Sequence, residues 1–191
     1  MAIEIPKYKV IKKEGKFELR EYEEYIMASV TINATDYYSA TNSGFRIVAD
    51  YIFGNNFKRD KIAMTAPVFQ EEEDKSEKIT MTAPVTTSQE KNAYTISFVM
   101  PKQYSIEELP TPNNRAVRLH KVPDFTSAVL TFSGILNEKI LAEKTQKLED
   151  WIKKKGLKSI GTIQAARYDP PWTPGFLRRN EVSLKLTLKK N

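Results

Sequence analysis

The segment DPPWTPGFLRRNE, residues 169–181, combines residue types that could bind a small molecule. Three prolines stiffen it, so ordering it costs little entropy, and Trp172 and Phe176 place large apolar groups in a loop. Arg178 and Arg179 add two fixed positive charges beside them. Together these residues could cap a flat, aromatic, anionic ligand. The other interpretation is a lid that seals the protein's own core and leaves both arginines on the surface.

Glu181, next to Asn180, is the candidate for acid or base chemistry. It fits either a hydrolase or isomerase that also uses nearby tyrosines, or a structural ion pair at the start of a strand. The sequence contains no GxSxG or HExxH motif, no cysteine and a single histidine. These absences predict no catalytic residue, no metal site of the protein's own and no enzymatic activity.

Further side chains could contact or ligate a cofactor. His120, which shares a strand face with Arg118, is either an axial ligand or an ordinary strand histidine. Met64 and Met81 either line a pocket with soft thioethers or pack in the core. The tyrosines that either bind a ligand or pack a helix onto a sheet are Tyr37, Tyr38 and Tyr51.

Composition is that of one globular domain spanning 1–191, with 40% hydrophobic residues and a net charge of +6. Residues 139–191 carry 13 Lys/Arg and 5 Asp/Glu, which indicates either an anion-binding surface or a solvated lysine-rich helix face. The lysine clusters lack interleaved aromatics, so we expect no nucleic-acid partner. Without a signal-like segment, a long apolar run or a cysteine, the chain is expected to be cytoplasmic and free of membranes. The sequence leaves the oligomeric state open, and a monomer is the favoured expectation.

Two nearly identical octets, KIAMTAPV at 61–68 and KITMTAPV at 78–85, place apolar side chains at every second position. A period of two is typical of a strand. The acidic stretch between them reads as a solvent-exposed connection. The octets are therefore predicted to form two antiparallel strands of one hairpin that end at Pro67 and Pro84.

Alternation predicts the remaining strands at 17–22, 25–32, 93–100, 116–122, 126–133, 160–168 and 181–188. Two helices are expected at 36–53 and 137–155, each followed by a glycine that stops it. The apolar stripe of the first helix is predicted to be Tyr38, Phe45, Val48, Ala49 and Ile52. That of the second is predicted to be Ile140, Leu141, Leu148, Trp151 and Ile152.

The order of elements repeats once along the chain. ASVTI at 28–32 and AVLTF at 128–132 each lead to one of the helices. Two half-repeats, about 16–100 and 115–189, therefore each contain two strands, a helix and two strands. This pattern predicts an α+β fold with pseudo-twofold duplication of a ββαββ unit, forming a distorted antiparallel β-barrel or curved sheet with two helices.

Several motifs in this order resemble those of the SOUL, or haem-binding-protein, family. They are ELREY at 18–22, GFRIVADYIFGNN at 44–56, both octets, ISFVMP at 96–101, LPTPNN at 109–114 and YDPPWTP…RRNEV at 168–182. The resemblance implies the distorted barrel with two helices. It also implies a fold similar to that of GyrI-like effector-binding domains.

The resemblance implies a site between the first helix and the loop before the last strand, where one group of the family holds a porphyrin in a shallow apolar cleft. The corresponding positions here are Asn42, Phe45, Arg46, Ala49 and Asp50 on the helix and Trp172 and Thr173 in the loop. The composition of the loop adds Phe176 and Arg178. That group has basic residues at the places of Asn42, Asp50 and Thr173, which suit anionic propionates.

The sequence therefore predicts binding of haem, another tetrapyrrole or a similar flat hydrophobic small molecule, weakly and without catalysis. One alternative is an effector-binding sensor, similar to GyrI-like domains, for a small cationic or apolar molecule or a protein partner. A further alternative is a hydrolase that uses Glu181.

Overall fold

The protein folds as one open β-sheet with two α-helices in the computed structural model, which describes residues 5–58, 61–62, 65–72, 92–169 and 172–187. The strands are β1 (Tyr8–Glu14), β2 (Phe17–Tyr22), β3 (Tyr25–Ala34), β4 (Val68–Glu72), β5 (Asn92–Val99), β6 (Arg118–Val122), β7 (Phe125–Ser133), β8 (Ser159–Arg167) and β9 (Arg179–Leu186). The helices are α1 (Tyr37–Ile52), α2 (Glu138–Lys154) and a short 3₁₀ turn, η1 (Gly175–Leu177).

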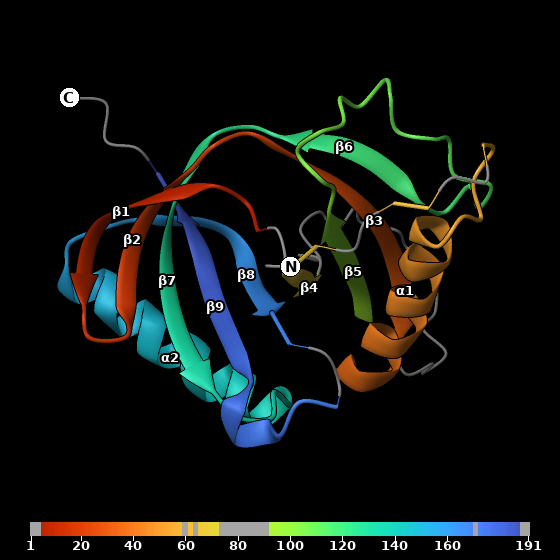
Figure 1. The fold of residues 1–191 in the computed structure, drawn as a ribbon. Coiled ribbons are helices and arrows are strands. Elements are labelled where there is room, and N and C mark those ends of the chain that lie inside the picture. Colours follow the sequence, from red (N-terminus) through yellow and green to blue (C-terminus); the bar gives the residue numbers. More distant parts are fainter. Residues whose placement is uncertain (1–4, 59–60, 63–64, 73–91, 170–171, 188–191) are drawn as a thin grey trace, which may run out of the picture.

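All nine described strands belong to one antiparallel sheet in the order β1-β2-β7-β9-β8-β4-β5-β3-β6. The sheet does not close, because β1 and β6 remain as edges, so the architecture is the curved α+β sheet rather than a barrel (Figure 1). In Figure 1, α1 lies along β3 and β5, and α2 lies behind β7 and β9. No helix in the described residues is both long and apolar enough to cross a bilayer.

The strand order carries the predicted duplication. In the duplication, β2, β3, β4 and β5 correspond to β6, β7, β8 and β9. When each strand is replaced by its counterpart, the order β2-β7-β9-β8-β4-β5-β3-β6, which leaves out the extra edge strand β1, is the same order in reverse. The first strand of each half is exchanged, because β2 pairs with β7 and β6 pairs with β3. The two ββαββ units are therefore interlocked; that they superpose, as halves of one 1–191 domain, stays a prediction.

The helices begin where the sequence offers a side-chain cap. Asp36 accepts a hydrogen bond from the Ser39 amide at 2.9 Å, and Asn137 accepts one from the Ile140 amide at 2.9 Å. Lys153 and Lys154 occupy the last turn of α2, where positive charge suits the exposed carbonyls. The predicted helices are confirmed.

Helix α1 rests unusually close to the sheet, because Gly44 faces Ile96 of β5 and leaves no room for a Cβ. The buried stripe of α1 therefore runs through Tyr37, Gly44, Val48 and Ile52. The prediction that Tyr38 points inward is wrong, since the side chain is 72% exposed. With the helix phase set by Gly44, the neighbouring Tyr37 takes the buried place.

The first octet is not a strand where it is described. Ile62 and Ala66 are buried as predicted, but the strand begins only at Val68. The Ile62 amide donates to the carbonyl of Ile52 at 2.8 Å, so this segment packs against the end of α1 instead of joining a ladder. Pro67 has no amide to donate, so β4 begins after it, at the last residue of the octet, and continues through 69–72, which belong to the predicted acidic connection.

The predicted hairpin of octets lies largely outside the described residues, because 63–64 and 73–91 are not among them. Within the described part, β4 pairs with β5 and β8. The sequence also missed β1, an edge strand rich in exposed lysines whose register shifts between Val10 and Lys12. An exposed, irregular edge strand has no clean apolar period to reveal it.

The two faces of the sheet are covered by different apolar clusters. One packs against both helices over a large apolar core that includes Val30, Phe98 and Leu148. The opposite face carries a smaller cluster built from Tyr22, Tyr25, Met27, Phe69, Val99, Val122 and Ala166. No helical residue belongs to this smaller cluster, so we call this side the helix-free face.

Candidate functional site

The loop that follows β8 exposes large apolar side chains. Trp172 is 83% exposed, Phe176 76% and Leu177 62%. The turn η1 sits against Ile135, since a Cβ on Gly175 would meet Cγ1 of Ile135 at 2.9 Å, and Ile135 is itself exposed. The interpretation of this loop as a lid over the protein's own core does not hold for these side chains, because they face solvent.

Hydrogen bonds fix the shape of the loop from within. The Arg178 side chain donates from Nε to the carbonyl of Thr173 at 2.7 Å, and the Arg179 amide donates to Asp169 at 2.6 Å. The Leu177 amide donates to the carbonyl of Pro174 at 2.9 Å. The described part of the loop, residues 172–178, therefore presents its aromatic residues from a backbone held by hydrogen bonds, which lowers the entropy lost when a ligand binds.

The outer face of α1 carries the polar residues predicted for the site. Asn42, Arg46 and Asp50 are exposed, whereas Ala49 is buried in the core. Phe45 lies between the two environments, with its ring 5.3 Å from that of Phe98. These positions follow from the helical period, which sets residues 42, 46 and 50 on one stripe facing away from β5.

The start of the loop meets the first turn of α1. The guanidinium of Arg167, the last residue of β8, lies 5.3 Å from the ring centre of Tyr37. The structure therefore brings the end of β8 to the N-terminal end of the helix, while Arg46 and Asp50 lie about two and a half and three and a half turns beyond Tyr37.

Of the basic residues predicted near the loop, Arg178 and Arg179 have different roles. Arg178 braces the loop through Thr173. Arg179 belongs to the helix-free face, where its Nη2 donates to Glu181 at 2.6 Å and its guanidinium lies 4.2 Å from the Tyr168 ring centre. A ligand on the loop would thus meet Arg178 but not the guanidinium of Arg179.

Glu181 lies at the centre of a buried network. Arg20 donates from both terminal nitrogens to the two carboxylate oxygens at 2.9 Å each, and only 3% of the Glu181 side chain is exposed. Tyr168 donates to Oε2 at 2.6 Å, and Thr131 donates to Oε1 at 3.2 Å. Every side of the carboxylate is therefore engaged by a donor of the protein itself.

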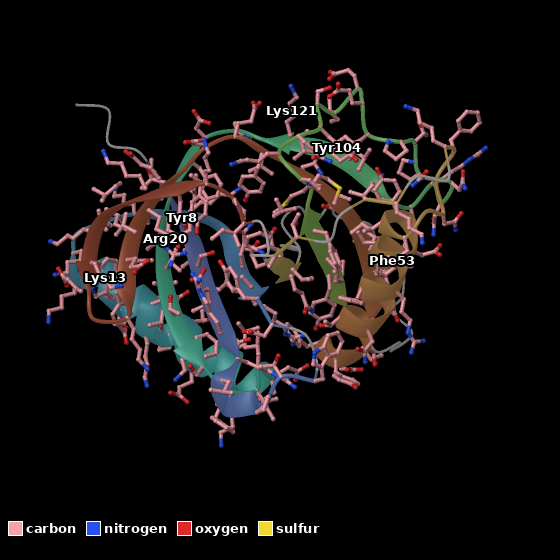
Figure 2. All side chains as sticks on the ribbon, in the orientation of Figure 1. Tyr8, Lys13, Arg20, Phe53, Tyr104 and Lys121 are labelled. Carbon is pink, nitrogen blue, oxygen red and sulfur yellow. The ribbon has the colours of Figure 1, made fainter. Side chains whose placement is uncertain are left out.

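Arg20 is as fully paired as its partner. Its Nε donates to Glu18 at 2.7 Å, its Nη1 also donates to the Tyr22 hydroxyl at 3.1 Å, and its guanidinium lies 4.3 Å from the ring centre of Tyr8 (Figure 2). Because β2 belongs to the first half of the chain and β9 to the second, the pair ties the two interlocked halves together. The arrangement is that of a structural brace.

The protonation of Glu181 follows from these contacts. Burial by itself would raise the pKa, but hydrogen bonds and charge from Arg20, with Tyr168 and Arg179, outweigh it and hold the pKa of Glu181 below its ordinary value. Burial and the charge of Glu181 raise the pKa of Tyr168. Glu181 is thus ionised and without a free lone pair, which does not suit a general acid or base.

His120 does not lie on the predicted ligand surface. It lies on the edge strand β6 opposite Met27, so its side chain is on the helix-free face. Partial burial and the charge of Lys185 lower the pKa of His120. Among the residues the structure describes, no three His, Cys, Asp or Glu side chains gather to hold a metal ion. Met64 and Met81 lie outside those residues.

Sequence reasoning missed the side chains of the network around Arg20 and Glu181 and two apolar residues in the loop or against it. These are Tyr8, Glu18, Arg20, Tyr22, Thr131, Tyr168, Ile135 and Leu177. The motif ELREY held a signal, because its alternation puts Glu18, Arg20 and Tyr22 on one strand face. Charged residues sharing a face with an aromatic indicate a buried ion pair, but the sequence does not name its partner.

Comparison with known sequences places this geometry in context. The model of the family described as SOUL heme-binding protein matches residues 3–185. Heme-binding protein 2 from Homo sapiens is 37% identical over 71 residues, which is 35% of this chain and 35% of that protein. The Mus musculus protein of the same name is 35% identical over 71 residues, again 35% of each chain. The curated relatives are thus matched over about a third of their length.

Solved structures share the fold at low sequence identity. The C-terminal domain of EcmrR superposes with a TM-score of 0.65 at 15% identity, covering 94% of this chain and 98% of that one. A hydrolase from Listeria innocua gives 0.57 at 12% identity, covering 93% and 94%. SAV2435 bound to tetraphenylphosphonium gives 0.53 at 11% identity, covering 90% and 93%.

Proposed function

The chain belongs to the SOUL heme-binding protein family, as its motifs predicted, and on that basis we propose that it binds haem or a similar flat tetrapyrrole without catalysis. The proposed surface lies between the exposed face of α1 and the loop 169–178. Members named for haem binding make this ligand the first to test, and the geometry of the loop supports it.

The exposure of Trp172 is the observation that carries the proposal. Its indole is 83% exposed on a loop whose backbone is held by internal hydrogen bonds, with Phe176 76% exposed nearby in sequence. When a flat apolar partner covers a large exposed aromatic side chain, apolar surface is removed from water, and this favours binding. A porphyrin offers such a surface, and it needs no deep cavity to stack on an indole.

The charges around this surface favour weak binding. Arg46 on α1 and Arg178, which also braces the loop, are the cations that the proposed surface carries, and Asp50 lies on the same helix stripe as Arg46 and opposes them. The single histidine of the chain faces the other side of the sheet, so it is not placed to ligate the iron. We expect an affinity of about −8 kcal/mol or weaker, in the micromolar range.

Absence of catalysis is supported by Glu181. The Glu181 carboxylate is enclosed by Arg20, Arg179, Tyr168 and Thr131, so it cannot take up or release a substrate proton without breaking the brace. The alternative of a cationic effector also lacks support on the helix-free face. Its rings of Tyr8, Tyr168 and Phe125 already lie under Arg20, Arg179 and Lys185 respectively.

A haem titration followed at the Soret band tests the proposal. Trp172→Ala should weaken binding about tenfold, since it removes a stacking surface worth about 1 kcal/mol or more. Phe57→Ala is the matched control, because Phe57 is also 83% exposed but lies beyond the other end of α1. His120→Ala should leave the Soret band where it is in the parent.

Two outcomes would count against haem at this surface. Equal weakening by Trp172→Ala and Phe57→Ala would mean non-specific adsorption to exposed aromatics. A sharp low-spin spectrum that disappears in His120→Ala would move the site to the helix-free face. Without any Soret change in the parent, the apolar effector or a protein partner becomes the better interpretation of the exposed loop.

A further inference from the structure

The sheet has two edges, β1 and β6, and they differ in how well they are protected from pairing with another strand. A sheet edge presents a row of backbone N–H and C=O groups to its surroundings. Proteins commonly prevent such a row from adding a foreign strand by means of a bulge or by the charges placed along it. The edge that lacks these protections is the one that could accept an extended segment of a partner.

Edge strand β1 is protected in two ways. Its register with β2 shifts between Val10 and Lys12, so the strand is not regular along its length. Two of its lysines are also paired within the chain, because Lys12 lies 3.2 Å from Glu14 and Lys13 lies 2.8 Å from Glu18. An irregular edge whose charges are already compensated is a poor template for a further strand.

Edge strand β6 is regular. Its five residues pair with β3 in one unbroken register, from Arg118 opposite Ser29 to Val122 opposite Tyr25. No backbone–backbone hydrogen bond apart from this pairing involves residues 118–122 in the described part of the chain. Figure 1 shows β6 next to β3 at the margin of the sheet. The backbone groups of β6 that point away from β3 therefore have no backbone partner among the described residues.

The charge on and beside β6 is positive. Arg115, Arg118 and Lys121 are exposed, and none of them forms an ion pair with another residue that the structure describes. The sequence has no acidic residue from 113 to 123, and residues 25–30 of the neighbouring β3 have no charged residue at all. This part of the edge thus carries cations that no carboxylate of its own strands compensates.

Carboxylates appear only past the ends of these strands. Asp124 follows β6, and Glu23 and Glu24 precede β3, where Glu23 already pairs with Lys7 at 3.4 Å. A second copy of β6 would bring like charges together across the edge, which disfavours pairing of the strand with itself. An acidic strand would meet opposite charges instead, so the complementary occupant is an acidic segment of another protein.

The spacing of the cations defines the segment further. Arg118 and Lys121 are three residues apart, so their side chains lie on opposite faces of the strand. Arg118 is on the helix-free face, together with His120, and Lys121 is on the face that carries the helices. Two acidic residues that are also three apart in an added strand would place one carboxylate beside each of these cations.

We propose that β6 is a docking edge for an extended acidic segment of a partner protein, which adds to the sheet as a further strand. Backbone hydrogen bonds to β6 hold the segment, and two acidic side chains three residues apart lie beside Arg118 and Lys121. The edge lies outside α1 and the loop 169–178, so this interaction does not depend on the proposed haem surface.

The test uses the full-length, ¹⁵N-labelled protein and the acetylated, amidated peptide of sequence VEVTEV, whose two glutamates are three positions apart. In amide correlation spectra, the peptide should shift the signals of residues 118–122 and leave the Trp172 indole signal in place. Hydrogen exchange should slow at the β6 amides that point away from β3, because the added strand supplies their acceptors. A haem titration should give the same result with and without the peptide.

Charge reversal on the edge tests the role of the cations. Arg118→Glu and Lys121→Glu should each weaken peptide binding about five- to tenfold in calorimetry, because an attractive charge becomes a repulsive one. Lys9→Glu is the matched control, since Lys9 is an exposed lysine on the protected edge β1, and it should bind like the parent. All three positions are exposed, and a thermal melt of each variant checks that it remains folded.

A second peptide tests the strand pairing. When all amide nitrogens of VEVTEV are methylated, the charges remain but no backbone N–H can be donated, so binding should weaken at least tenfold. Equal binding of the two peptides would mean attraction between charges alone and would overturn the proposal. It would also be overturned by equal binding of the parent and Arg118→Glu, by shifts confined to β1 or the loop 169–178, or by no shifts at millimolar peptide.

Discussion

The guanidinium of Arg20 faces the carboxylate of Glu181 across 161 positions of sequence, with both nitrogen–oxygen distances at 2.9 Å. The two side chains are 1% and 3% exposed. They connect β2 to β9 across the strand β7, which lies between them, at the place where the two halves of the chain exchange strands. Because each charge is buried, neither can lose the other without leaving an unpaired ion inside the protein.

Arg20→Ala should lower the free energy of unfolding by about 3–5 kcal/mol, since Glu181 would remain buried with part of its charge unpaired. Urea denaturation at neutral pH measures the loss. Lys13→Ala is the control: Lys13 pairs with Glu18 of the same network, but its side chain is 64% exposed, so its loss should cost less than about 1 kcal/mol. Similar losses for the two variants would contradict the brace.

Stability should depend on the ionisation of Glu181. Its pKa in the folded protein lies below the ordinary value of 4.5, so the unfolded state binds this proton more readily. The stabilising contribution is complete above about pH 4.5 and is lost as the pH falls through the lower folded pKa. Urea unfolding between about pH 5 and pH 2 should show a falling free energy that is less steep in Glu181→Gln.

Glu107→Gln is the control for this series, because Glu107 is an exposed glutamate outside the network. It should reproduce the parent's slope. If Glu181→Gln also keeps the full slope, the acid sensitivity of the protein comes from other carboxylates, and Glu181 contributes none of it.

Gly44→Ala should destabilise the protein by about 1–3 kcal/mol, although alanine is the better helix former. A Cβ at position 44 would lie 2.6 Å from Cδ1 and 2.8 Å from Cβ of Ile96, which forces α1 away from β5. Thermal or urea unfolding measures the change. Ser43→Ala, at the exposed neighbouring position, should change the free energy by less than about 0.5 kcal/mol. A stabilised Gly44→Ala would show that the helix can withdraw freely.

Asp50→Lys should tighten haem binding about three- to tenfold in the Soret titration, because it replaces a charge that repels propionates with one that attracts them. Asp50 also accepts a hydrogen bond from Asn55 at 2.5 Å, so the variant loses a contact at the end of α1. Asp50→Asn controls for the charge alone and should give an intermediate affinity. Unchanged affinity in both variants would place the propionates elsewhere.

Much of the fold could be predicted because local physics marks it in the sequence. The helices at 36–53 and 137–155 were recognisable from their apolar period and terminal glycines, and their caps Asp36 and Asn137 confirm why they start where they do. Strands such as β7 and β9 could be predicted from the alternation of their apolar and polar residues. Edge strand β1 has no buried face of that kind and gave no such signal.

The candidate site was predictable only as a set of residues. The sequence identified Trp172 and Phe176 as large apolar groups in a stiff loop, but whether they seal a core or face water depends on what lies beneath them. That outcome was decided by the packing of η1 on Ile135, a residue about 40 positions away. In the octet KIAMTAPV, Ile62 is buried beside the end of α1, and Thr65, Ala66 and Pro67 are buried in succession, so burial in the described part does not follow the alternation of the sequence.

The sequence by itself determined the duplicated order of strands and helices, the helix boundaries and the family, because these depend on interactions between near neighbours and on motifs read in order. The tertiary structure alone decided that β2 and β6 cross into opposite halves and that Arg20 meets Glu181. Periodicity tells each side chain which face it occupies, but partners far apart in the chain are chosen by the packing of the whole sheet.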